Sequence, residues 1–117
     1  MPCPYSRWVL ERLEEMLGRR IARVHIVGGG TRNKLVGARH ALPLLHADAM
    51  QRPVITGPVE ATAIGNIMTQ AIAAGEVGTL AEARQIIAAS FPAETYEPGP
   101  AAGWSEAYQQ YYRLLAE

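Results

Sequence analysis

The hydrophobic positions recur at helical spacing in the first part of the chain. A helix is predicted over residues 7–17, where Ser6 stands at an N-cap position and Gly18 stands where a helix ends. Four apolar residues fall on one face of this helix: Val9, Leu13, Met16 and Leu17. The charged residues on its other face are expected to lie in water.

Two short runs rich in β-branched residues predict strands. Residues 21–27 (IARVHIV) form a nearly continuous apolar run that stops at three glycines, which is typical of a buried parallel strand. Residues 53–56 (PVIT) form the second run, and Gly57 and Pro58 then turn the chain into a helix predicted over residues 59–74. This order of strand, helix, strand and helix predicts an α/β fold with two short parallel strands and flanking helices.

The remaining segments are predicted as helices and one loop. Pro43 interrupts the helical pattern of residues 33–50, which predicts two short helical pieces there. Thr79 and Glu82 form a capping box for a helix that lasts to about residue 90. Residues 91–103 are rich in Pro, Gly and Ala and are expected to form an extended surface loop before a terminal helix. Aromatic residues at helical spacing, Trp104, Tyr108 and Tyr111, favour packing of that helix over base stacking.

Composition and charge narrow the class of protein. The 117 residues include 11 Lys and Arg and 11 Asp and Glu, so the formal net charge is 11 − 11 = 0 and gives no electrostatic case for binding nucleic acid or a membrane. With 49% hydrophobic residues, the chain suits one globular domain. Its single cysteine, Cys3, forms no internal disulfide. We expect a cytoplasmic protein, because the sequence shows no apolar stretch of about 20 residues and no signal-peptide pattern.

The glycine run offers one candidate for chemistry. Gly28, Gly29 and Gly30 follow a predicted strand and precede a helix that starts near Asn33, which brings backbone amides and a helix N-terminus together as a phosphate requires. The alternative is a turn that merely needs positive φ angles. The dinucleotide fingerprint is rejected because Asn33 stands where its third glycine belongs, and the Walker pattern is rejected because no glycine precedes a Lys-Ser or Lys-Thr pair.

Other polar or small residues are interpreted structurally. His25 is expected to be a hydrogen-bonded core histidine, and His40 and His46 lack the spacing of a metal pair, so no metal site is predicted. Asp48 is expected to serve as a hydrogen-bonding cap, and Gly65 to allow a close crossing with another helix. The residues alone therefore indicate an α/β fragment that binds a nucleotide or phosphate, with no catalytic residue assigned.

Several phrases in order resemble the C-terminal part of the FGGY carbohydrate kinases. They are RWVLERLEEMLGRRI, VHIVGGGTRNKL, ADAMQRPVITGPVEATAIGN, then the capped helix and TYEPGP. The resemblance as a whole extends from about residue 7 to residue 112. The resemblance implies that residues 1–117 are part of the second, ATP-side domain of an actin-like ATPase (ribonuclease H-like) fold. It also implies ATP or ADP with Mg as cofactor and a sugar as substrate.

The resemblance assigns residues to the nucleotide. The glycine at Gly29 contacts ADP or ATP, Asn33 borders the adenosine pocket, and Gly28, Gly30 and Thr31 complete the loop. It also makes the helix that contains Gly65 an interdomain connecting helix, which crosses the helix at residues 7–17.

The departures from the family pattern limit the function expected of this chain. It lacks the first phosphate-binding loop, the sugar-binding residues, the Mg ligands and the aspartate that acts as general base, so catalysis by the chain alone is not expected. GARHALPL also inserts residues into a family helix between Asn33 and Asp48. The missing strands would leave an open sheet edge, which predicts self-association. Two alternatives to a nucleotide-binding part of a kinase stay open: a non-catalytic interaction remnant and an independent phosphate-binding module.

Overall fold

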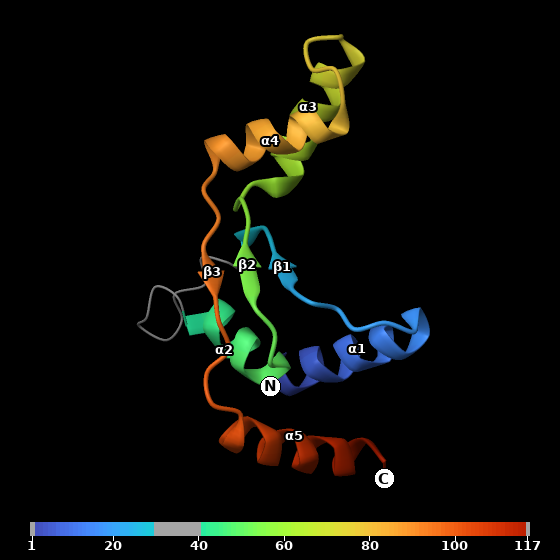
Figure 1. The fold of residues 1–117 in the computed structure, drawn as a ribbon, viewed down its shortest axis with the longest axis vertical. Helices are drawn as coiled ribbons and strands as arrows, with labels where there is room; N and C mark the ends of the chain where they lie inside the picture. Colours follow the sequence, from blue (N-terminus) through green and yellow to red (C-terminus); the bar gives the residue numbers. More distant parts are fainter. Residues whose placement is uncertain (1, 30–40, 117) are drawn as a thin grey trace.

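The fold contains five helices and three short strands in its described part. The structure is a computed structural model that describes residues 2–29 and 41–116 (Figure 1). Its elements are α1 (Pro2–Leu17), β1 (Val24–Ile26), α2 (Ala41–Met50), β2 (Val54–Thr56), α3 (Ala61–Ala73), α4 (Leu80–Ser90), β3 (Thr95–Tyr96) and α5 (Ala102–Leu115). The predicted α/β class is confirmed.

The strands form one sheet in the order β1-β2-β3. β1 and β2 are parallel, as predicted, with Val24 opposite Val54. The prediction of only two strands is wrong, because part of the predicted surface loop pairs antiparallel with β2 as β3, with Tyr96 opposite Val54. The Thr56 amide donates to the Glu94 carbonyl over 2.9 Å and extends this pairing.

β1 is shorter than the predicted strand at residues 21–27, and side chains explain where the strand begins. The Ile21 amide donates to Glu14 Oε1 over 2.8 Å, and the Ile21 carbonyl accepts from Arg52 Nε over 3.0 Å. Both backbone groups of Ile21 are thus satisfied by side chains, and the ladder starts only at Val24, whose amide donates to the Pro53 carbonyl.

Prolines set the start of two helices. α1 begins at Pro2 and not near Arg7, so the prediction that Ser6 caps it is wrong. Pro2 and Pro4 lie in the first turn, where a missing amide costs no helical hydrogen bond. Pro43 likewise lies in the first turn of α2, which confirms the second predicted helical piece. The first piece, with the inserted residues before Ala41, lies outside the described residues.

A small apolar core joins α1, α2 and the sheet. Leu10, Ala47, Met50 and Val54 are buried together, and Ile21, Val24, Ile26 and Tyr96 pack around them. Among the described residues Val54 has the largest fully buried side chain, and it lies on the central strand of the sheet.

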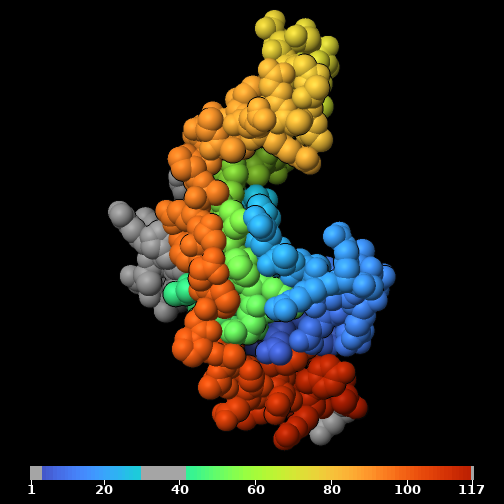
Figure 2. Space-filling view, in the orientation of Figure 1, coloured from blue at the N-terminus to red at the C-terminus, as the bar shows by residue number. Residues whose placement is uncertain are grey.

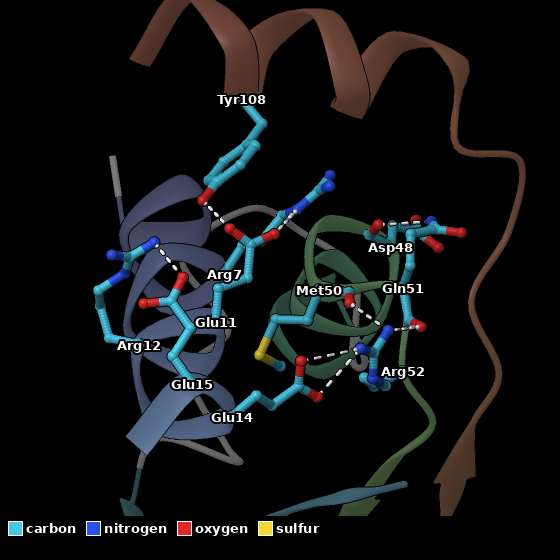
Figure 3. A network of polar contacts seen from close by, with 10 residues as sticks. All are labelled: Arg7, Glu11, Arg12, Glu14, Glu15, Asp48, Met50, Gln51, Arg52 and Tyr108. Carbon is cyan, nitrogen blue, oxygen red and sulfur yellow. Dashed lines mark hydrogen bonds and ion pairs between the residues drawn. The ribbon is translucent and has the colours of Figure 1, made fainter. Parts of the chain in front are cut away.

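Two polar clusters fasten the helices around this core (Figure 3). Arg52 Nη2 donates to Glu14 Oε1 over 3.0 Å, which ties the end of α1 to the residues just before β2. The pKa of Glu14 lies below its ordinary value, mainly because the carboxylate accepts the hydrogen bond from the Ile21 amide. The hydrogen bond and charge of Arg52 lower the pKa further.

The second cluster attaches α5 to α1. The Tyr108 hydroxyl donates to Glu11, and the Arg7 guanidinium lies 4.2 Å from the centroid of the Tyr108 ring (Figure 3). Burial and the Glu11 carboxylate raise the pKa of Tyr108 well above its ordinary value. The predicted packing role of this aromatic residue is confirmed, since Tyr108 is the buried residue of α5.

The remaining helices extend the molecule at the opposite end of the sheet. α3 and α4 pack on each other beyond the carboxyl ends of β1 and β2, while α5 lies at the other end (Figure 1). The radius of gyration is 17.0 Å, against about 13 Å for a compact domain of this length. No helix in the described part has the length and apolar character needed to cross a bilayer.

Candidate functional site

The loops that follow β1 and β2 are joined by backbone hydrogen bonds. The Gly28 amide donates to the Pro58 carbonyl over 2.9 Å, and the Gly57 amide donates to the Ile26 carbonyl over 2.7 Å. Because the two strands are parallel, their carboxyl ends meet at one edge of the sheet, which is where open α/β sheets bind ligands. The two loops therefore form one hydrogen-bonded unit at that edge.

Gly28 and Gly57 are glycines for different reasons. Gly28 has a φ of +85°, a conformation that side chains other than glycine rarely adopt. At Gly57, a Cβ would lie 2.6 Å from Val27 Cγ1, so the space itself excludes a side chain. Gly57 was predicted only as a turn residue, although a glycine directly after a strand is also a signal for close backbone approach.

Gly29 is the accessible member of the glycine run. It is exposed, and a Cβ built on it would meet nothing within 4 Å. A phosphate group could therefore approach the Gly29 backbone closely, and in this respect the described loop fits a nucleotide. Gly30, Thr31 and Asn33, which the sequence also assigned to the nucleotide, lie outside the described residues.

The glycine run was expected to offer free backbone amides to a phosphate, but the Gly28 amide is not free. It already donates to the Pro58 carbonyl, so its role is to shape the loop and not to bind a phosphate through that hydrogen. The positive φ of Gly28 confirms that a conformational turn is part of the reason for the glycine run. The interpretation as a conformational turn therefore applies to Gly28, and the interpretation as a point of close ligand approach applies to Gly29.

A hollow lies beside this unit at the start of α3. It measures about 310 Å³ and lies between the Gly57-Pro58 turn and the end of α4. Its lining includes Glu60, Ile64, Ser90 and Phe91. Glu60 occupies the N-cap position of α3, and its side chain makes no capping hydrogen bond.

Three other sequence predictions have clear outcomes. His25 is exposed, so the prediction of a core histidine is wrong: Val24 and Ile26 face the core and the pleat turns His25 to the other side. Asp48 Oδ1 accepts from the Gly99 amide over 2.7 Å, which confirms a hydrogen-bonding role. The predicted helix crossing at Gly65 is absent from the described structure, since a Cβ there would meet nothing within 4 Å and α3 packs on α4.

Comparison with known proteins identifies the family. The model of the C-terminal domain of the FGGY family of carbohydrate kinases matches residues 3–74, from α1 through the glycine loop and both parallel strands to the end of α3. The chain belongs to the FGGY family of carbohydrate kinases. The predicted resemblance is thereby confirmed, and the matched range includes every residue that the sequence assigned to the nucleotide.

Three similar proteins within the FGGY family are rhamnulokinases. The chain is 44% identical to a rhamnulokinase of Bacteroides thetaiotaomicron over 102 residues, which are 87% of this chain and 20% of that protein. It is 40% identical to a rhamnulokinase of Bacillus subtilis over 76% of this chain and 17% of the relative. It is 36% identical to a rhamnulokinase of Yersinia pestis over 92% of this chain and 21% of the relative. The chain thus spans about a fifth of the length of these relatives.

Proposed function

We propose that this chain is the nucleotide-facing part of the second domain of an ATP-dependent sugar kinase of the rhamnulokinase type. In such a kinase, a phosphoryl group passes from ATP to a ketose hydroxyl. The observation that supports this proposal most directly is the joined pair of loops at the carboxyl ends of β1 and β2, which leaves Gly29 exposed beside the start of α3. Similarity to three rhamnulokinases over most of the chain supports the kind of kinase.

Within this proposal each residue of the loop has a distinct task. Gly28 bends the chain and is fixed by Pro58, so that the Gly29 backbone is held in place before the nucleotide arrives. Gly29 admits the phosphates to close contact, and by the family resemblance Gly30, Thr31 and Asn33 extend the contact toward the adenosine. A Mg ion bound with the nucleotide would neutralise phosphate charge, with ligands that this chain does not supply.

The sugar and the general base belong, on this proposal, to the part of a full-length relative that the chain does not match. Positioning of nucleophile, metal and phosphates together accounts for most of the catalysis of phosphoryl transfer. We therefore expect nucleotide binding by this chain without turnover. Its affinity should be weak, because only one wall of the nucleotide site is present.

Calorimetric titration of Mg-ATP and Mg-ADP into the chain tests this function. Gly29→Asp should abolish binding because its carboxylate would face the phosphates, while the fold should persist because the new Cβ meets nothing within 4 Å. Gly103→Asp is the matched control: it makes the same charge change on α5, at another position where a Cβ meets nothing within 4 Å, and should bind normally. Absence of binding by the folded chain would contradict the proposal and favour a non-catalytic interaction unit.

A further inference from the structure

The pairing between the segments that follow β1 and β2 changes register at Gly28. Figure 2 shows the end of β1 (light blue) lying against β2 (green), just below the α3–α4 pair. Inside the sheet, the Val24 amide donates to the carbonyl of the residue directly before its partner in β2. The same rule would take the Gly28 amide to the Gly57 carbonyl. It donates to the Pro58 carbonyl, one residue further along, so the regular ladder ends where the glycine loop begins.

Gly57 is required at this point because of Val27. A Cβ at position 57 would lie 2.6 Å from Val27 Cγ1 and 3.7 Å from Val27 Cβ. The backbone conformation does not require glycine, because the φ of Gly57 is not in the positive range. Core packing does not require it either, because Val27 is 55% exposed. A side chain at position 57 would therefore disturb mainly the course of the chain from Val27 into Gly28.

Val27 has little freedom to move aside by itself. Its β-branched side chain is restricted to few conformations about the first torsion angle. The next residue, Gly28, is hydrogen-bonded to Pro58 and lies so close to the second loop that a Cβ on it would be 3.8 Å from the Val59 carbonyl oxygen. We expect a displacement of Val27 to move Gly28 and the exposed Gly29 with it.

We propose that Gly57 is a positioning residue for nucleotide binding. The space left by its missing side chain holds Val27 and thereby fixes where the Gly29 backbone meets the phosphates. A loop that is held in its binding position before the ligand arrives loses less freedom on binding. The inference rests on the proposed function, but it assigns to Gly57 no contact with the nucleotide, since Gly57 acts through Val27.

Gly57→Ala tests this role, and Val27→Ala should rescue it. The added Cβ should raise the dissociation constant of Mg-ADP by about tenfold or more, the effect of losing one hydrogen bond to a charged group. Val27→Ala removes Cγ1 and leaves only the Cβ at 3.7 Å, an ordinary contact, so the double variant should bind like the original chain. Gly65→Ala is the matched control: it adds the same atom where nothing lies within 4 Å and should bind normally.

NMR spectra of the nucleotide-free variants separate positioning from a general loss of stability. Gly57→Ala should shift the amide signals of Gly28 and Gly29, and the double variant should return them, while the signal of the buried Val54 stays in place in both. Titration with Mg-ADP on the same samples gives the dissociation constants of the folded chains. The two measurements together relate the position of the loop to its affinity.

The outcomes distinguish this inference from the proposed function. If the original chain does not bind Mg-ADP, the proposed function fails and the role of Gly57 fails with it. If the original chain binds and Gly57→Ala binds equally well, only the role of Gly57 is overturned. Weaker binding that the double variant does not recover also overturns it, as does weaker binding with a shifted Val54 signal, which would mean a general structural role.

Discussion

Around α1, α2 and β2 the chain buries Leu10, Ala47, Met50 and Val54 in one cluster, whereas α3 contains no buried residue along its 13 positions. Yet both regions are rich in apolar residues, and α3 exposes Ile67 to 63%. The difference shows that apolar composition does not decide burial. In the first region, α1 and α2 pack together against the sheet and cover its apolar residues. In the second region, α3 and α4 pack mainly on each other within the described structure.

The two regions also differ in how their polar groups are used. Near the core, charged side chains such as Glu14 and Arg52 connect elements that are far apart in the sequence. In α3 and α4, side-chain hydrogen bonds connect near neighbours in the sequence, for example from Thr69 to the Gly65 carbonyl and from Ser90 to the Ile86 carbonyl, each four residues back. We therefore expect the stability of the first region to depend on contacts between residues far apart in the sequence. The stability of the second region should depend on contacts between near neighbours.

The largest contrast is expected from truncating one side chain in each region. Met50→Ala removes a side chain that is 5% exposed in the core and should lower the free energy of unfolding by about 2–5 kcal/mol. Ile67→Ala on α3 removes one that is largely exposed and should cost less than about 0.5 kcal/mol. Urea unfolding followed by circular dichroism measures both, and equal losses would show that the two regions do not differ in this way.

A smaller effect is expected from the ion pair at the end of α1. Glu14→Gln keeps the shape but weakens the contacts to Arg52 and the Ile21 amide, and should cost about 2 kcal/mol at neutral pH. The folded-state pKa of Glu14 is lowered, so the carboxylate stabilises the fold above its unfolded-state pKa, and this contribution is lost as the pH falls through the folded value. The original chain should therefore lose stability on acidification below about pH 5 more steeply than the Gln variant. Parallel curves of unfolding midpoint against pH would contradict this role.

The sequence predicted elements whose signals are local. The capping box of α4, the parallel pair of strands and the helical spacing of Tyr108 all depend on neighbouring residues, and all three were confirmed. The FGGY family was also predicted correctly from the sequence, because the motifs IVGGGTRN and GPVEATAIGN occur in the family's order.

The errors concern features that depend on distant partners. β3 consists of two residues and forms because Thr56 lies beside Glu94, a contact 38 positions apart that no local pattern records. His25 was placed in the core because its neighbours are apolar, but a strand of three residues with one covered face exposes every second side chain. Gly65 was assigned a crossing helix, which the described chain does not supply.

The smallest expected effect concerns the start of α4, where stability should be local. The Glu82 amide donates to Thr79 Oγ1 over 3.1 Å, and the Glu82 carboxylate accepts from the Gly78 amide over 2.8 Å, so the box closes one residue earlier than its usual form. Thr79→Ala should destabilise α4 by about 1 kcal/mol, while Thr79→Ser keeps the acceptor and should cost much less. Because α4 lies outside the core cluster, hydrogen exchange should accelerate for amides of residues 80–90 and stay unchanged around Val54. Equal acceleration in both places would mean that the α3–α4 pair unfolds together with the core and that the two regions form one cooperative unit.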